Sequence, residues 1–268
     1  MKQYGLIGRV LKHTFSPAYF AAKFERESLK DVSYTAWELP VIEDLPALLL
    51  GNPEILGLNV TIPYKKDVCA YTDELFGPAA GLNVVNTLVI ERNVEPFEGQ
   101  KIPGLKIKGF NTDVFGFKES VKPLLRPWFE RALILGTGAT ADSVAYVLFK
   151  LGIDTLFVSR NPQGEQEIAW EDVNEHVIYF HPFIINTTPI GMFPHNDAFP
   201  PIPYERLTDQ HLLYDLIYNP AETAFLRKGK EAGAQIQNGE TMLMLQAEQS
   251  WKTWNQGTIT DYELMSFS

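Results

Sequence analysis

A short apolar run followed at once by a glycine-rich turn, at residues 132–141, is the feature that most constrains how this chain can fold. Residues 132–135 read Ala-Leu-Ile-Leu, which is typical of a strand buried on both faces of a parallel sheet. The pattern Gly136-x-Gly138-x-x-Ala141 follows directly. Gly136 permits a tight turn, Gly138 allows the backbone to approach a pyrophosphate, and Ala141 is small enough for close helix–strand packing. The stretch therefore predicts a strand, a phosphate-binding turn and the start of a helix.

The residues after the turn complete a βαβ unit. Apolar residues recur at helical spacing as far as Leu151, and Gly152 stands where a helix would end. Residues 155–158, Thr-Leu-Phe-Val, predict the second strand of a right-handed crossover. Because the glycines lie between a strand and a helix in a unit of about 30 residues, they indicate a Rossmann-type dinucleotide-binding domain. The alternative is a glycine turn in an α/β fold that binds no ligand.

The end of the second predicted strand indicates which dinucleotide is preferred. An acidic residue there would hold the ribose 2′-hydroxyl of NAD, but this chain has Ser159 and Arg160. A guanidinium suits the 2′-phosphate of NADP, so NADP is the expected cofactor. The alternative for Arg160 is a solvated surface arginine.

Composition excludes several kinds of partner. The 268 residues carry a net charge of −10, whereas binding to nucleic acid needs a basic face. The single cysteine, Cys69, excludes an intramolecular disulfide framework and suits a reducing cytosol, so we expect a cytoplasmic protein. No run approaches the roughly 18 apolar residues of a membrane span, so no membrane partner is expected. The sequence also offers no credible cluster of metal ligands.

The first 111 residues alternate strands and helices as well. Strands are predicted at residues 3–7, 32–39 and 55–60, with helices from Pro17 to about Glu27 and over residues 41–50. Ser16 is a candidate cap for the first helix. We therefore expect a first α/β domain whose sheet is mixed and mainly parallel.

Polar residues follow the strand predicted at residues 55–60, in the sequence Asn59-Val-Thr-Ile-Pro-Tyr-Lys65. Ligands of α/β sheets bind beyond the carboxyl ends of strands, so Asn59, Thr61 and Lys65 are candidates for a site. Lys65 could equally be a solvated surface lysine. Asp113 begins a helix predicted over residues 113–121 and could be no more than a helix cap.

Further strands are predicted at residues 177–180, 183–186, 212–216 and 235–237. Thr223 is a candidate cap for a helix that ends near Ala232. A last helix, from Glu240 to about Trp254, is expected to pack back on the first domain. We therefore predict two domains with a cleft between them, residues 1–111 plus 239–268 for the substrate and residues 112–238 for the dinucleotide.

Taken together, these pieces resemble the shikimate dehydrogenase family. The matches span nearly the whole chain and come in the family's order. They are His13-Thr-Phe-Ser-Pro17, Asn59-Val-Thr-Ile-Pro-Tyr-Lys65, Gly81-Leu-Asn-Val-Val-Asn-Thr87, Gly109-Phe-Asn-Thr-Asp113, the glycine loop, Asn186-Thr-Thr-Pro-Ile-Gly-Met192, Asp215 to Pro220 and Gly239 to Gln246. Any one of them is weak, but eight in order make coincidence improbable.

The resemblance implies reversible, NADPH-dependent reduction of 3-dehydroshikimate to shikimate, a step of aromatic amino acid biosynthesis, by a monomer or homodimer. Lys65 and Asp113 would be the catalytic pair. The implied substrate-binding residues are Thr14, Ser16, Asn59, Thr61, Asn86, Tyr218 and Gln246. The implied cofactor-binding residues are Gly136, Thr137, Gly138, Ala139, Thr140, Ala141, Ser159, Arg160, Asn186, Thr187, Thr188, Met192 and Gly239.

The chain departs from the family's usual pattern in three places. Thr14 replaces a serine but keeps the hydroxyl, and the loop reads Gly-Thr-Gly-Ala in place of Gly-Ala-Gly-Gly. Ser159 replaces a common asparagine, and the further basic residue often found after Arg160 is missing. Since Asp142 also lies near the phosphate-binding turn, we expect a weaker preference for NADP than is usual in the family.

Two other functions remain open from the sequence. One is a quinate/shikimate dehydrogenase paralogue with relaxed use of NAD and NADP. The other is a non-catalytic dinucleotide-sensing module, because the fold alone does not specify catalysis. A sensor has no need for Lys65 and Asp113 together, so their joint presence favours an enzyme.

Overall fold

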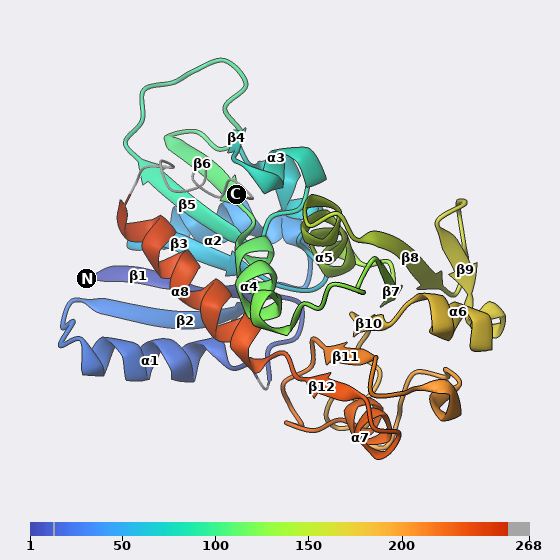
Figure 1. Ribbon diagram of the computed structural model, residues 1–268. Helices are drawn as coiled ribbons and strands as arrows, with labels where there is room; N and C mark the ends of the chain where they lie inside the picture. Colours follow the sequence, from blue (N-terminus) through green and yellow to red (C-terminus); the bar gives the residue numbers. More distant parts are fainter. Residues whose placement is uncertain (13, 257–268) are drawn as a thin grey trace. The chain divides into compact units, whose positions relative to one another are not determined.

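The computed structural model describes residues 1–12 and 14–256 (Figure 1). His13, which opens one of the sequence motifs, and residues 257–268, which the sequence assigns to the first domain, lie outside the described residues. The described residues divide into two compact units, one of residues Met1–Thr112 together with residues 247–256, and one of residues Asp113–Gln246. The predicted domains change at residues 111/112 and 238/239, so the units and the predicted domains differ at Thr112 and over residues 239–246. The substrate and cofactor roles of the two parts stay predictions.

The sheet of the first unit has six strands in the order β2-β1-β3-β5-β6-β4 (Figure 1). Their bounds are β1 Lys2–Gly8, β2 Val32–Glu38, β3 Ile55–Val60, β4 Glu74–Leu75, β5 Thr87–Arg92 and β6 Leu105–Phe110. Strand β1 is parallel to β2 and β3, and β4 is parallel to β6. Strand β5 is antiparallel to both of its neighbours, β3 and β6. A mixed, mainly parallel sheet is thus confirmed.

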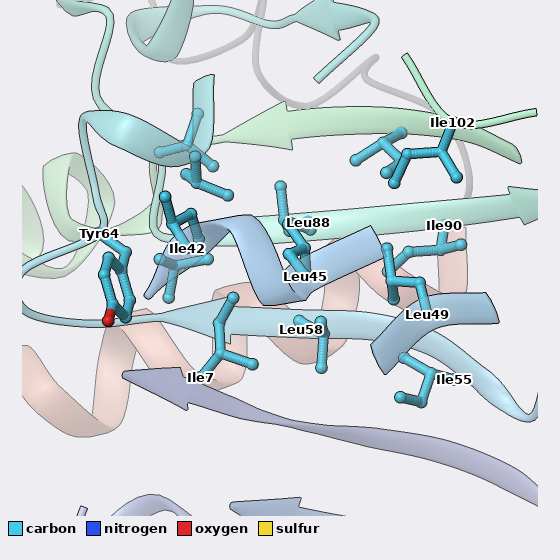
Figure 2. Packing of buried hydrophobic residues seen from close by; sticks show 14 of the residues in the cluster. Ile7, Ile42, Leu45, Leu49, Ile55, Leu58, Tyr64, Leu88, Ile90 and Ile102 are labelled. Carbon is cyan, nitrogen blue, oxygen red and sulfur yellow. The ribbon is translucent and has the colours of Figure 1, made fainter. Parts of the chain in front are cut away.

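Helices cover both faces of this sheet. They are α1 Ser16–Arg26, η1 Ile42–Asp44, α2 Leu45–Gly51, η2 Asp67–Tyr71 and α3 Pro78–Leu82. On one face, Leu45 and Leu49 of α2 pack in a cluster with Ile7 and Leu58 of the strands (Figure 2). On the other face, aromatic residues of α1 and of the last helix cluster around Tyr4. Burial of these apolar side chains is the main stabilisation of the unit.

The start of α1 corrects one prediction. Its cap position is Phe15, and no side chain caps the helix there. Ser16 is instead the first helical residue and is buried, so the prediction that it caps the helix was wrong. Pro17 stands in the first turn as expected, where its missing N–H leaves no helical bond unmade.

The second unit is built on six parallel strands in the order β9-β8-β7-β10-β11-β12. The strands are β7 Arg131–Leu135, β8 Asp154–Ser159, β9 Glu167–Ala169, β10 Phe183–Asn186, β11 Leu212–Asp215 and β12 Gln235–Gln237. The helices that follow in chain order are α4 Thr112–Val121, η3 Lys122–Leu124, α5 Ala139–Lys150, η4 Trp170–Asp172, α6 Glu175–Phe180, η5 Tyr204–Arg206, α7 Ala224–Glu231 and α8 Glu240–Gln256. Helix α8 begins in the second unit and belongs to the first unit from Ala247. This is the strand order of the Rossmann fold, in which the order reverses between the first and fourth strands, here β7 and β10.

For this unit one prediction was wrong, one strand was missed and one prediction was confirmed. Residues 177–180, expected as a strand, belong to helix α6, which the side chain of Asn174 caps by accepting from the N–H groups of His176 and Val177. The third strand, β9, was not predicted, because three residues at a sheet edge are too short for a periodic pattern. Thr223 does cap α7, since its side chain accepts from the N–H of Leu226.

Candidate functional site

Gly136 is required by the fold of the second unit. It has a φ of 108°, a conformation that residues with a Cβ rarely adopt. A Cβ at this position would also lie 2.9 Å from the hydroxyl oxygen of Thr187 and 2.9 Å from a methyl carbon of Thr188. The turn after β7 and the loop after β10 therefore approach each other at Gly136.

Gly138 differs, because nothing in the described part of the protein demands a glycine there. Its φ of −81° is open to any residue, and a Cβ would meet no described atom within 4 Å. The residue caps α5, a 12-residue helix with no side-chain cap, whose first turn comprises Ala139, Thr140 and Ala141. N–H groups of a first helical turn lack acceptors within the helix and attract anions. The open space at Gly138 thus fits the pyrophosphate of a dinucleotide.

The loop after β10 is fixed beside this turn. The N–H and the hydroxyl of Thr187 both donate to the carbonyl of Leu135, at 3.0 and 2.7 Å. The side-chain oxygen of Asn186 accepts from the N–H of Thr188 at 3.1 Å and from its hydroxyl at 2.7 Å. Ligands of doubly wound sheets bind where the strand order reverses, so residues 186–188 lie where the sequence predicts part of the cofactor site.

The remaining predicted cofactor residues have different surroundings. Ser159 is buried at the end of β8 and accepts from the N–H of Asn161, whereas the next residue, Arg160, is exposed. Met192 is 47% exposed, which suits a side chain that contacts a ligand. At Gly239, an added Cβ would overlap the backbone of Leu216. Chain packing therefore explains the glycine at position 239 without any cofactor contact.

Asp215, at the end of β11, anchors this part of the unit and was not recognised in the sequence as a structural residue. It is fully buried and accepts from the side chains of Asn186 at 3.0 Å and Thr223 at 2.6 Å, and from the N–H of Ile217 at 3.1 Å. Burial raises the pKa of Asp215 to about 6, although these donated hydrogen bonds oppose the shift.

In the first unit, Lys65 is buried, while the next residue, Lys66, is exposed. The carbonyl of Lys65 accepts from the N–H of Val85 at 2.8 Å. A residue that is only 9% exposed does not fit a solvated surface lysine. The sequence alternative of a surface lysine therefore describes Lys66 better than Lys65.

Asp113 is also buried, at 5% exposure, and is the second residue of α4. It therefore lies inside the helix, whereas a cap residue precedes the first helical residue. The N–H of Thr112, the residue before it, donates to the side-chain oxygen of Asn86 at 2.7 Å. Lys65 is thus hydrogen-bonded to Val85, and Thr112, the residue before Asp113, is hydrogen-bonded to Asn86. Val85 and Asn86 are consecutive in the chain.

The predicted substrate residue Asn59 is engaged inside the first unit at both ends of its amide. Its oxygen accepts from the hydroxyl of Tyr34 at 2.9 Å, and its nitrogen donates to the hydroxyl of Ser250 at 2.8 Å. Burial raises the pKa of Tyr34, which keeps that hydroxyl protonated, and Ser16 hydrogen-bonds the same tyrosine. These bonds support a role for Asn59 in holding the site together.

The other predicted substrate residues are distributed over both units. Thr14 and Thr61 are half-buried in the first unit, before α1 and after β3. Tyr218 is half-buried in the second unit, and Gln246, buried in α8, donates to the carbonyl of Leu243 at 2.9 Å.

No group of three His, Cys, Asp or Glu side chains among the described residues could hold a metal ion. No described helix combines the length and apolar character needed to cross a membrane.

The strand order of the second unit and its glycine turn define the class, an α/β protein with a Rossmann-type unit. Residues 6–88 match the family model of the shikimate dehydrogenase substrate binding domain. The shikimate dehydrogenase (NADP(+)) of Carboxydothermus hydrogenoformans is 32% identical over 93% of this chain and 90% of its own length. That of Halothermothrix orenii is 33% identical over 93% and 89%. The chain belongs to the shikimate dehydrogenase family.

Solved structures agree with this membership. The structure of shikimate 5-dehydrogenase from Thermus thermophilus, in complex with NADP(H) and shikimate, is 29% identical and has a TM-score of 0.78. The match covers 96% of this chain and 94% of that one. Quinate dehydrogenase from Corynebacterium glutamicum, at 24% identity and a TM-score of 0.80, shares the fold.

Proposed function

We propose that this chain is an NADP-dependent oxidoreductase that interconverts 3-dehydroshikimate and shikimate. The observation that carries the proposal is its similarity, over nine-tenths of its length, to relatives named shikimate dehydrogenase (NADP(+)). The solved structure with NADP(H) and shikimate supports both the cofactor and the substrate. The test is an assay of purified protein with shikimate or quinate and with NADP or NAD. Well-folded protein that turns over none of the four combinations would overturn the proposal.

The chemistry that we assign to the chain's own residues is charge stabilisation and proton transfer. NADPH, when bound, supplies the hydride that reduces the ring carbonyl. Negative charge then develops on the carbonyl oxygen, and the ammonium of Lys65 can stabilise this charge and supply the proton. The carboxylate of Asp113 would orient that ammonium. Because both side chains are buried, their interaction with a bound substrate is weakly screened by water.

The residues of the second unit suit the nucleotide. We assign the pyrophosphate to the first turn of α5, where Gly138 leaves open space, and the 2′-phosphate to Arg160 directly after β8. A paralogue that uses NAD or quinate is the second candidate. Its support is local, because no second basic residue follows closely after Arg160 and Asp142 adds an acidic group to the first turn of α5. The four-way assay separates the two candidates.

Lys65→Ala should lower the turnover number by about 10²–10⁴, the range for general acid–base groups, and leave NADP affinity unchanged. The adjacent Lys66→Ala is the matched control, since Lys66 is exposed and is expected to keep nearly full turnover. Steady-state kinetics of both variants, with cofactor titrations, make the comparison. Equal turnover of Lys65→Ala and Lys66→Ala would rule out the proposed catalytic lysine.

Two finer properties complete the proposal. We infer a cytoplasmic location from the single cysteine, which excludes an intramolecular disulfide framework and suits a reducing compartment. The expected assembly is a monomer or a homodimer, which sedimentation analysis would distinguish.

A further inference from the structure

Three buried hydroxyl and amide groups of the first unit meet the hydroxyl of Ser250 in α8. The side chain of Ser250 is fully buried. Its oxygen lies 2.8 Å from the amide nitrogen of Asn59, 2.9 Å from the hydroxyl of Thr87 and 3.1 Å from the hydroxyl of Thr112. Buried polar atoms are costly unless they are hydrogen-bonded, so this cluster depends on all of its members.

Donor and acceptor chemistry sets the direction of these bonds. The amide nitrogen of Asn59 can only donate, so the oxygen of Ser250 accepts from it. The amide oxygen of Asn86 can only accept, so the hydroxyl of Thr112, 3.1 Å away, donates to it. The proton of Ser250 is then available to the oxygen of Thr112 or Thr87. A continuous path runs from Asn59 through Ser250 and Thr112 to Asn86.

Thr112 is the member of this path that precedes Asp113, the proposed catalytic carboxylate, in the chain. Its N–H also donates to the oxygen of Asn86, at 2.7 Å, so its backbone and side chain are both held. The next residue along the chain is Asp113. A change in the position of Thr112 therefore moves the peptide that carries the proposed catalytic carboxylate. Displacement of a reacting group by about 1 Å can cost on the order of 100-fold in rate.

We propose that Ser250 is a positioning residue, whose hydroxyl holds Thr112 and thereby sets the place of Asp113. The inference rests on the proposed function, in which Asp113 is half of the catalytic pair. A purely structural role is the competing explanation. It predicts a loss of stability on removal of the hydroxyl, with no dependence on Asp113.

The kinetic experiment is a double-mutant cycle of Ser250→Ala and Asp113→Asn in the full chain. Ser250→Ala should lower the turnover number for shikimate by about 10-fold and leave NADP affinity unchanged. In the Asp113→Asn background the further loss should be less than about 2-fold, because coupled groups are non-additive. Thr72→Val is the control, since Thr72 is a buried hydroxyl of the same unit that donates to the carbonyl of Cys69. It should reduce stability and keep turnover.

A second measurement does not depend on activity. Hydrogen exchange of the Thr112 amide should become about 10-fold faster in Ser250→Ala, while the Val89 amide within β5 stays unchanged. Ser250→Cys, which keeps a weakly polar side chain of similar size, should restore part of the turnover and serves if the alanine variant does not fold. Equal losses of turnover in both backgrounds, or unchanged exchange at Thr112, would overturn the positioning role. Failure of the unmodified protein to oxidise shikimate would instead reject the proposed function, and the exchange data would still decide whether Ser250 holds Thr112.

Discussion

At the scale of single residues, two glycines of one motif, two positions apart, serve different ends. Gly136 is demanded by the protein, through its positive φ and the approach of Thr187 and Thr188. Gly138 has an ordinary φ and open space where a Cβ would lie. Gly136 is therefore needed for the backbone conformation of the turn, whereas Gly138 leaves open space that a ligand could occupy.

Gly136→Ala and Gly138→Ala should therefore separate stability from binding. Gly136→Ala should lower the free energy of unfolding by about 1–3 kcal/mol, the usual cost of a strained backbone. Gly138→Ala should melt like the unmodified protein and bind NADP more weakly. Thermal melting and cofactor titration of the two variants make the test, and a large loss of stability in Gly138→Ala would contradict this interpretation.

Arg160 is expected to distinguish the two nicotinamide cofactors. Arg160→Ala should lower the affinity for NADP by roughly 10–150-fold, since a charge-assisted hydrogen bond contributes about 1.5–3 kcal/mol. NAD has no 2′-phosphate and should bind almost as before. Titration of both cofactors measures the difference. Equal weakening of NADP and NAD would mean that Arg160 does not contact the 2′-phosphate.

At the scale of elements, the ends of β10 and β11 and the start of α7 are joined by one buried carboxylate. Asp215 accepts from Asn186 of β10 and from Thr223, and the hydroxyl of Thr223 also caps α7. Asn186 in turn orders Thr188 beside the glycine turn. The loops that are expected to meet the cofactor are therefore positioned by bonds between secondary-structure elements.

This carboxylate should make stability depend on pH. The pKa of Asp215 is about 6 in the folded protein, against 3.8 for an unperturbed side chain. Between these values the folded state keeps a proton that the unfolded state has released, so stability falls as the pH rises from about 4 to about 6. The loss amounts to roughly 3 kcal/mol at most, from about 1.4 kcal/mol per pKa unit. Asp215→Asn should flatten this part of the profile in denaturant unfolding at several pH values, and an unchanged slope would contradict the assignment.

At the scale of the whole molecule, the chain leaves the first unit at the start of α4 and returns to it within α8. The return is secured by aromatic packing. The ring of Trp254 stacks on Tyr4 with centroids 4.8 Å apart, and its N–H donates to the carbonyl of Leu88 at 2.9 Å. Gly57 of β3 makes room for this ring, because a Cβ there would overlap it. The part of α8 from Ala247 onward to Gln256 thus belongs to the core of the first unit.

Trp254→Ala should consequently destabilise the protein by about 3–5 kcal/mol, the usual cost of removing a buried aromatic side chain. Trp254→Phe keeps most of the packing and loses the hydrogen bond to Leu88, so it should cost about 1 kcal/mol. Denaturant unfolding of the two variants gives the comparison. Similar small losses for both would show that the end of α8 contributes little to the first unit.

The sequence by itself determined the class of fold and the order of its parts, because these follow from local patterns. The apolar run before Gly136 predicts a buried strand, and β7 is that strand. The helix end at Gly152 and the cap of α7 at Thr223 likewise depend on neighbouring residues only. Of the candidate site, the end of the second strand in the βαβ unit indicated Arg160, and the family motifs supplied the roles of Lys65 and Asp113; all three roles stay predictions.

Tertiary structure decided what depends on residues far apart in the chain. The bond between Asn59 and Ser250 joins residues 191 positions apart, a separation at which no local pattern of hydrophobicity or capping carries information. Burial has the same origin, since Lys65 and Lys66 are identical side chains side by side in the sequence, and only packing of the folded chain buries the first and exposes the second.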